Sequence, residues 1–347
     1  MRKFLVFPVI SIAVLSSTVA IAQQSPLLQP FGPTVKIIGT PEPGTNLGIS
    51  GPANVPPRWS LAQWSIPKNL APAVNAPASG WTTANGYGRV VFSPTQDGFT
   101  NVYELAQAGN VCGVERDMFL GAGSDDLQGL QASAPLSEVG SLFASITLQP
   151  QYFSTSKDCQ NQYGQYVYSF ILSSTGGNGY PPQTWFYQVN VGRNAPFEKQ
   201  ANPGWCPGYD DRATQEFCAD DDVRNLNTGH IVFGQKGGVV DFELLPRLKA
   251  IIQSNHRKVG AGSSVRLDPE LSHWRITSIY LGEILQGKTI STTRWSNPKL
   301  DQYKGGTFCS KNKTVQFICN VERPPNNWGW DRQADGCWHR TTMEACR

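Results

Sequence analysis

The sequence predicts a mainly β protein: an antiparallel β-sandwich with one short amphipathic helix and a small disulfide-rich C-terminal module. Three observations support this fold class. The 347-residue chain is rich in turn formers, with 34 glycines and 25 prolines. Its 10 tryptophans, 11 tyrosines and 16 phenylalanines favour strands. Several segments also alternate apolar and polar residues with the two-residue period of a half-buried strand.

The first residues have the pattern of a secretory signal peptide, which we expect to span residues 1–22. A basic start at Arg2 and Lys3 precedes an apolar stretch, and Ala20-Ile21-Ala22 supplies the small residues of a cleavage site. Residues 23–79 are crowded with proline and glycine, and we expect an extended, partly disordered segment there. Its exception is the run from Trp59 to Ile66, which could attach to the following domain.

The predicted sandwich covers residues 80–303. Its strongest strand is residues 163–173, where every second side chain from Tyr166 to Leu172 is aromatic or aliphatic. A glycine- and proline-rich loop at 175–182 separates it from residues 185–191, so the two segments are expected to form an antiparallel pair. Other strands are predicted at residues 87–93, 141–149, 231–233, 239–242, 274–282 and 289–295.

One segment has helical rather than strand periodicity. Residues 243–254 place apolar side chains on one stripe, which indicates an amphipathic helix packed on a sheet. Asp241 is positioned to cap its N-terminus, and Pro246 is tolerable only in its first turn.

The segments Thr184-Trp185-Phe186-Tyr187-Gln188-Val189 and His273-Trp274-Arg275-Ile276, with the helix after Asp241 and the late strand ending in Leu281-Gly282-Glu283, resemble those of secreted concanavalin A-like sandwiches. These are the jelly-roll domains of lectins and endoglycanases. The resemblance covers roughly residues 80–303 and implies the fold. It implies no activity, because the paired-acid strand Glu-x-Asp-x-x-Glu of laminarinase-like glycosidases is absent, as is the strand set of alginate lyases.

The chain has eight cysteines, an even number behind an export signal, so we expect four disulfides. Short loops favour pairing Cys206 with Cys218, and Cys112 with Cys159 would then be a longer tie across the sandwich. The other four, Cys309, Cys319, Cys337 and Cys346, lie in residues 304–347, predicted to be a small stapled module. A zinc site of these cysteines with His339 is the weaker alternative, because close ligand pairs are lacking.

The segment 205–222 combines aromatic residues with carboxylates and has the composition of a sugar-binding loop. Aromatic rings pack on the apolar face of a sugar, and carboxylates bind its hydroxyls. Trp328 and Trp330 alternate with polar groups and could form a second stacking surface, or could be the core of the small module. The candidate ligand-binding residues are Trp205, Tyr209, Asp210, Asp211, Trp328 and Trp330.

The same segment offers a candidate calcium site at Asp220, Asp222 and Asn225, whose oxygens are of the type that calcium prefers. The ligand order of an EF-hand is absent. A solvated acidic loop without metal is the alternative, and no other cofactor is expected.

Catalytic residues are not identified by a motif. A glycosidase needs two carboxyl groups facing one another, and two sets of acidic residues could supply them. The first set is Glu104, Glu115 and Asp117, and the second is Asp210, Asp211 and Glu216. The four histidines are scattered, and no Gly-x-Ser-x-Gly motif supports a serine nucleophile.

The charge pattern argues against a nucleic-acid partner, because the net charge is only +3 and no lysine or arginine cluster is present. No apolar run after the leader is long enough to span a bilayer. We therefore expect a secreted carbohydrate-binding protein that recognises a glycan or polysaccharide. An endo-acting glycoside hydrolase or polysaccharide lyase on the same scaffold is the first alternative, and a structural or adhesive surface protein is the second.

Overall fold

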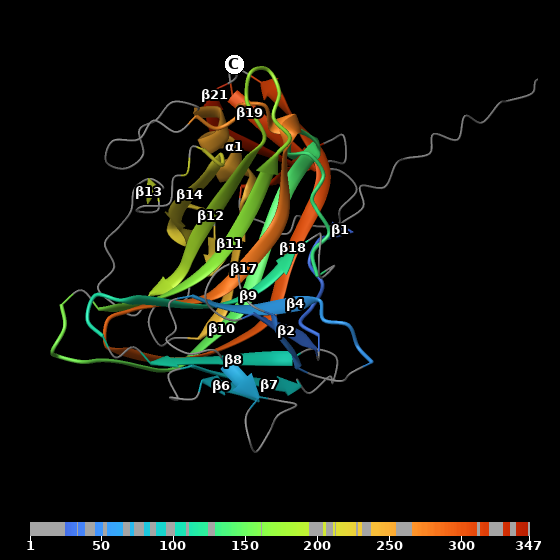
Figure 1. The fold of residues 1–347 in the computed structure, drawn as a ribbon. Helices are drawn as coiled ribbons and strands as arrows, with labels where there is room; N and C mark the ends of the chain where they lie inside the picture. Colours follow the sequence, from blue (N-terminus) through green and yellow to red (C-terminus); the bar gives the residue numbers. More distant parts are fainter. Residues whose placement is uncertain are drawn as a thin grey trace, which may run out of the picture.

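Two β-sheets contain most of the described residues and face one another across a shared core (Figure 1). The computed structural model describes residues 25–32, 34–38, 46–50, 54–64, 70–72, 80–83, 88–94, 101–108, 111–123, 129–160, 162–193, 204–205, 211, 213–226, 228–230, 237–254, 266–310, 313–318, 329–333 and 338–345. Within these ranges the predicted fold class is confirmed: a mainly antiparallel β-sandwich with one short α-helix.

The first sheet has twelve described strands. Its main path runs in the order β15 (Thr228–His230), β16 (Gly238–Glu243), β10 (Val139–Thr155), β18 (Thr289–Ser310), β8 (Asn101–Ala108), β7 (Gly88–Pro94), β6 (Gly80–Thr83) and β5 (Leu70–Pro72). Four short strands attach to β18 or to one another: β1 (Ser25–Pro26), β19 (Lys313–Ile318), β20 (Asp331–Arg332) and β21 (Trp338–Ala345).

The second sheet has nine described strands. Its order is β13 (Gly204–Trp205), β14 (Glu216–Asp222), β12 (Gln183–Arg193), β11 (Tyr163–Ser174), β17 (Trp274–Gln286), β9 (Glu115–Gly123), β4 (Trp59–Trp64), β2 (Val35–Ile38) and β3 (Asn46–Ser50). The expected antiparallel pair around loop 175–182 is confirmed as β11 and β12. The predicted strand at 231–233 lies outside the described residues.

Alternation along the strands builds the core. Tyr168 and Phe170 of β11 are fully buried, and both rings contact Phe242 of β16 in the opposite sheet. Tyr166 likewise contacts Trp295 of β18, with ring centroids 6.2 Å apart. The side chains between these positions point to the other face of the sheet. The periodicity of residues 163–173 therefore predicted the correct buried face.

The single α-helix of the described residues, α1 (Leu245–Ser254), matches the predicted one. Leu245, Leu248 and Ile252 are fully buried against the sandwich core. Its capping differs from expectation: the Glu243 carboxylate, not Asp241, accepts a hydrogen bond from the Leu245 amide. Glu243 also accepts hydrogen bonds from the Ser141 hydroxyl and the Leu142 amide, so the capping residue joins α1 to β10.

The described parts of residues 23–79 are not a spacer, and that expectation is corrected. Strands β2, β3 and β4 extend the nine-stranded sheet, and Leu27, Phe31 and Trp59 are buried in the main core. The Phe31 and Trp59 rings meet edge to face, 4.6 Å apart. The prolines and glycines lie between these apolar residues, so composition concealed a segment that does bury apolar surface.

The expected boundary between residues 303 and 304 falls inside a strand. β18 continues to Ser310, and its last residues pair with β19. The C-terminal strands are also anchored by side chains, because Trp330 is buried beside Phe143 and Tyr303 of the sandwich. Residues 304–347 are thus a continuation of the twelve-stranded sheet in their described parts.

One disulfide is described completely, and it is the predicted tie across the sandwich. Cys112 precedes β9 of one sheet and Cys159 follows β10 of the other, and they are bonded. Cys218 is also disulfide-bonded, and no described cysteine is free. Cys206, Cys319, Cys337 and Cys346 lie outside the described residues, as does the side chain of Cys309, so their pairing stays a prediction.

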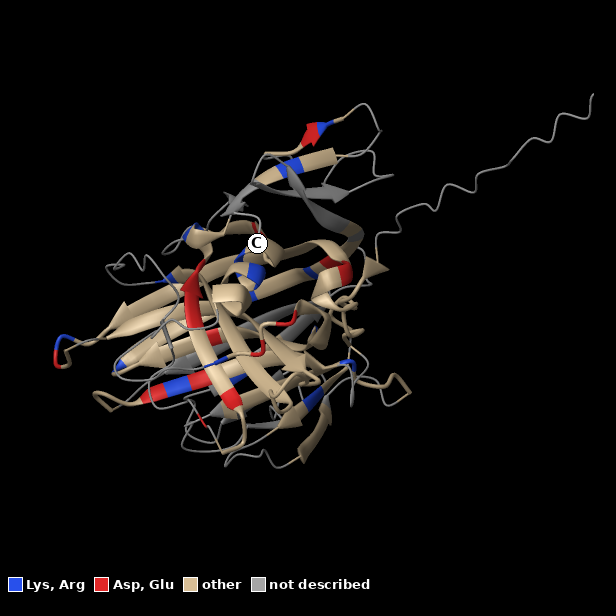
Figure 2. Ribbon diagram, turned by 90° about the horizontal axis from the view of Figure 1, so that it is seen from above, with Lys and Arg blue, Asp and Glu red and all other residues tan. Residues whose placement is uncertain are grey.

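Charged residues are scattered over the described ribbon, and no blue area of arginine and lysine dominates it (Figure 2). This agrees with the small net charge of +3. In the part of the chain that the structure covers, no helix has the length and hydropathy needed to cross a membrane.

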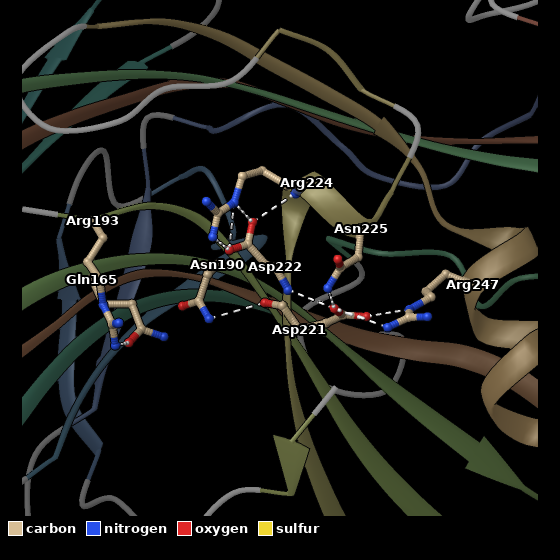
Figure 3. Close-up of polar contacts among 8 residues, drawn as sticks. All are labelled: Gln165, Asn190, Arg193, Asp221, Asp222, Arg224, Asn225 and Arg247. Carbon is tan, nitrogen blue, oxygen red and sulfur yellow. Dashed lines mark hydrogen bonds and ion pairs between the residues drawn. The ribbon is translucent and has the colours of Figure 1, made fainter. Parts of the chain in front are cut away.

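A buried carboxylate joins helix α1 to the edge of the nine-stranded sheet (Figure 3). Asp221 of β14 is fully buried, and its Oδ2 accepts hydrogen bonds of 2.7 Å from Arg247 Nε and from the Tyr187 hydroxyl. Its Oδ1 accepts one from Asn225 Nδ2 at 2.6 Å. Each oxygen therefore has protein donors, and the arginine of α1 has its counter-charge inside the fold.

Asp221→Asn should lower the free energy of unfolding by about 3 kcal/mol, because it removes one partner of a buried ion pair and leaves Arg247 without a counter-charge. Urea unfolding measures this change. Lys288→Met is the control, since the Lys288–Asp158 pair is exposed at 3.6 Å and should contribute less than about 1 kcal/mol. Equal decreases in the free energy of unfolding in the two variants would show that the buried Asp221–Arg247 pair contributes no more than the exposed one.

Candidate functional site

The candidate site lies on the face of the nine-stranded sheet that points away from the core, which we call the outer face. Side chains of a strand alternate between two faces, so the residues between the core positions of β9, β11, β12, β14 and β17 share it. Its floor is apolar: Phe119, Val167 and Ile284 form a separate buried cluster, with Tyr163 and Tyr280 packed against it. Polar residues surround this floor: Glu115, Asp117, Gln165, Ser169, Gln188, Asn190, Arg193 and Asp220.

A row of residues in register crosses four neighbouring strands on this face. Asp220 of β14 lies opposite Gln188 of β12, which lies opposite Ser169 of β11, which lies opposite Tyr280 of β17. The Tyr280 hydroxyl donates to Gln188 Oε1 at 2.7 Å, and Gln188 Nε2 donates to Asp220 Oδ1 at 2.8 Å. The small Ser169 side chain lies between them in the row and leaves room for this contact over β11.

A second group of polar residues lies toward the start of β9. The Tyr163 hydroxyl donates to Glu115 Oε2 at 3.0 Å. The Arg193 guanidinium lies 4.9 Å from the centre of the Tyr163 ring, and its Nη2 donates to Gln165 Oε1 at 3.2 Å (Figure 3). The disulfide between Cys112 and Cys159 is only a few residues from Glu115 and Tyr163, so it holds the starts of both strands.

The two groups act on one another electrostatically. Burial raises the pKa of Asp220 from 3.8 to about 6, the hydrogen bond from Gln188 opposes the rise, and the charge of Glu115 adds to it. Arg193 lowers the same pKa. Burial, followed by the Glu115 charge, raises the pKa of Tyr163, so its phenol stays protonated and remains a donor. The charge of Glu115 therefore influences Asp220, although four strand spacings separate β9 from β14.

Such an arrangement can perform acid–base chemistry. A carboxyl group with a pKa near 6 is partly protonated near neutral pH and can donate a proton to a leaving group. Glu115 is an exposed carboxylate on the same face, where it could act as a base or a nucleophile. The apolar floor with Phe119 and Tyr280, whose rings lie 4.9 Å apart, could accept the C–H face of a sugar.

The structure distributes the sequence-predicted carboxylates unequally. Glu115 and Asp117 lie on the outer face. Asp211 is exposed at a turn, where hydrogen bonds from the Thr214 and Ala213 amides lower its pKa, and its backbone pairs with Glu216. Glu104 belongs to β8 of the other sheet, which separates it from Glu115. Asp210 lies outside the described residues.

The aromatic candidates are also separated. Trp205 is in β13, whose backbone pairs with β14, so part of the expected loop 205–222 is strand. Trp330 is buried, with the Arg340 guanidinium 4.9 Å from its ring centre, as expected of a core residue rather than an exposed stacking surface. Tyr209 and Trp328 lie outside the described residues.

The candidate calcium ligands have protein partners. Asp220 accepts from Gln188, Asp222 pairs with Arg224 at 2.5 Å, and Asn225 donates to Asp221. No group of three or more histidine, cysteine, aspartate or glutamate side chains suited to a metal ion occurs among the described residues. A calcium ion at this position stays a prediction.

One histidine contacts a buried acid at the end of the sandwich. His273 Nδ1 lies 2.7 Å from Asp268 Oδ2, and the Ser174 hydroxyl donates to the same oxygen at 2.9 Å. Ser174 is thus bonded to the carboxylate and not to the imidazole. In a catalytic triad the nucleophile hydroxyl is hydrogen-bonded to the histidine, and the histidine to an acid that orients it. This group does not have that arrangement, and we regard it as a structural link.

Sequence reasoning missed most of the outer-face residues: Tyr163, Gln165, Gln188, Arg193 and Tyr280. A signal for them does exist, because they occupy the positions between the apolar core residues of strongly alternating strands. Polar and aromatic residues in those positions mark a second, half-buried face. The order of the strands in the sheet decides which of these side chains come into contact, and the sequence alone does not give that order.

No protein-family model matches the chain, and neither does any curated protein. Among solved structures, an endoglucanase from Rhodothermus marinus aligns with 65% of this chain and 96% of its own, at 12% identity and a TM-score of 0.36. A family 11 xylanase from Neocallimastix patriciarum covers 64% and 90% at 7% identity, with a TM-score of 0.36. A family 12 xyloglucanase from Bacillus licheniformis covers 70% and 100% at 8% identity, with a TM-score of 0.32. Similarities this low assign neither an activity nor a substrate to this chain.

Proposed function

We propose that the chain is an exported, endo-acting glycoside hydrolase that binds a polysaccharide on the outer face. Asp220 is the general acid, and Glu115 is the second carboxylate. The observation that carries the proposal is the raised pKa of Asp220, about 6, on a face where the charge of Glu115 contributes to that rise. Glycoside hydrolysis requires two carboxyl groups in unlike environments, about 5–10 Å apart. In this proposal the Asp220 and Glu115 side chains must therefore reach toward one another over the strands that separate them.

The size and composition of the face support a polymeric ligand. The residues from Asp220 to Glu115 cross five neighbouring strands, at about 4.8 Å for each spacing. An apolar floor with polar edges suits a sugar chain, whose rings have apolar faces and whose hydroxyls point outward. The leader at residues 1–22 and the disulfide between Cys112 and Cys159 support export.

The charges of the site favour hydrolysis over a lyase reaction. Around the apolar floor, the described carboxylates Glu115, Asp117 and Asp220 outnumber the guanidinium of Arg193. A polysaccharide lyase must bind a uronate, and this surplus of negative charge would repel it. A neutral polysaccharide is therefore the better substrate class. Binding without hydrolysis remains the second function, supported by the same aromatic floor.

The test is to incubate the protein expressed without residues 1–22 with neutral and uronate-containing polysaccharides. Reducing ends and unsaturated products are then measured from pH 4 to 8. We expect reducing ends from a neutral polysaccharide, and we expect kcat/KM to fall as pH rises through about 6, because Asp220 must be protonated to act. Retention on a polysaccharide without cleavage would select binding alone, and unsaturated products would select the lyase.

A further inference from the structure

The two carboxylate oxygens of Asp220 have different surroundings. Oδ1 accepts the 2.8 Å hydrogen bond from Gln188 Nε2, whereas Oδ2 accepts none from the described residues. A proton placed on Oδ1 would point at the hydrogen of the Gln188 N–H group, and the two hydrogens would repel one another. When Asp220 is protonated, its proton is therefore placed on Oδ2.

The orientation of the Gln188 amide is decided by Tyr280. The phenol donates to Oε1, which leaves Nε2 to face Asp220. Nε2 also lies 3.7 Å from the sulfur of Cys218, a weak acceptor. The reversed amide would place Oε1 against Oδ1, two acceptors facing one another whenever Asp220 is ionised. The three contacts consequently agree on one orientation.

The ring of Tyr280 is itself held in place. It packs against Phe119 with a centroid distance of 4.9 Å and belongs to the apolar floor of the outer face. Gly282, two residues later, has no space for a Cβ, which would lie 2.9 Å from an atom of the Phe119 ring. Phe119 therefore packs closely over β17, next to Tyr280, and the phenol oxygen is presented to Gln188 by a rigid ring.

We infer that Tyr280 acts on Asp220 through Gln188, as a positioning pair that keeps the acid proton on Oδ2 and directs it to the substrate. Neither residue needs to contact the reacting atoms. The inference deepens the proposed function, because it assigns the orientation of the acid at that same site. The geometry predicts that loss of either contact changes how Asp220 titrates, whether or not a substrate is present.

The experiment is a carbon-13 NMR titration of the Asp220 carboxyl group in wild type, Tyr280→Phe, Gln188→Glu and Gln188→Leu. Tyr280→Phe removes one oxygen and keeps the ring, and we expect the pKa of Asp220 to rise by about half a unit because the donor is no longer fixed. Gln188→Leu should raise it by about one unit, and Gln188→Glu by more, because it sets a like charge against Asp220. The double variant Tyr280→Phe with Gln188→Leu should titrate like Gln188→Leu alone, since Tyr280 acts only through the amide.

Two controls make the result specific. Ser169 lies in the same row, between Gln188 and Tyr280. Ser169→Ala removes a hydroxyl without filling the space over β11, so the pKa of Asp220 should be that of wild type. Tyr152→Phe removes an exposed phenol on the other sheet and should also have no effect. An unchanged titration in Tyr280→Phe, or additive shifts in the double variant, would overturn the inference.

The titration separates this inference from the proposed function. If the protein cleaves no polysaccharide, the coupling of Tyr280 to Asp220 can still be observed. If it does cleave one, Tyr280→Phe should lower kcat by about tenfold with KM nearly unchanged and shift the alkaline limb of the pH profile upward. A change in KM alone would instead assign Tyr280 to substrate binding, which contradicts the positioning role.

Discussion

Asp220→Asn is expected to lower kcat/KM for polysaccharide hydrolysis by about 100- to 10,000-fold, the range attributed to a positioned general acid. Asparagine keeps the shape of the side chain and its contact with Gln188, but it cannot donate the proton that the leaving group needs. Initial rates of reducing-end release measure the loss. Glu115→Gln should produce a loss of similar size, because the partner carboxylate is then neutral.

Stability should change in the opposite direction. The half-buried Asp220 carboxylate is held in an environment that disfavours its charge, so Asp220→Asn should leave the urea midpoint at pH 7 unchanged or raise it. Glu138→Gln, at an exposed position outside the outer face, is the control for both measurements. Wild-type activity in Asp220→Asn would remove Asp220 from the mechanism, and a coincident loss of stability would attribute the effect to misfolding.

The second large effect concerns an acid inside the sandwich. Glu283 of β17 is fully buried and faces the core, where burial raises its pKa from 4.5 to about 8, although the Thr293 and Ser291 hydroxyls oppose the rise. The folded protein therefore holds a proton that the unfolded chain releases above pH 4.5. The stabilisation that this proton gives to the folded state is fully present below pH 4.5. It is lost progressively as pH rises toward 8, by on the order of 4 kcal/mol.

Urea unfolding at intervals from pH 4.5 to 9 checks this prediction. Glu283→Gln keeps the size and the hydrogen-bonding capacity of the side chain but cannot ionise, so the variant should be less sensitive to pH and more stable than wild type at pH 8. Because Asp220 and other acids also titrate, the quantity to compare is the difference between variant and wild type at each pH. A constant difference across the range would refute the assignment.

How far the sequence predicted the fold can be judged from particular strands. Alternation at Tyr166, Tyr168 and Phe170 identified the buried face of β11, because burial on one side of a strand leaves a direct pattern. β18 was expected to end at Trp295, yet it continues for 15 more residues to Ser310. Asn297 adopts a positive φ of 54°, and the register with β10 shifts beside it. A bulge therefore absorbs Asn297-Pro298, and the strand continues past the predicted end.

The candidate site was predictable only in part. Glu115 was among the expected carboxylates because it is one of a few acids near the first cysteine, Cys112. Asp220 was assigned to a candidate calcium site with Asp222 and Asn225, because their side-chain oxygens lie close together in sequence. The meeting of Glu115 and Asp220 on one face depends on the order β14-β12-β11-β17-β9. That order arises from pairings between segments far apart in the chain, which composition and periodicity do not encode.

The position of β18 in the sheet determines when the fold can close. It is the central strand beside both β10 and β8, and its Gln302 also pairs with Ser25 near the start of the described chain. Because it is made from residues 289–310, the 288 residues before it must be synthesised before the twelve-stranded sheet can form. Such dependence on distant pairing slows folding. Until β18 has been made, the edges of β10 and β8 that it pairs with stay open, and open edges are places where chains can associate wrongly.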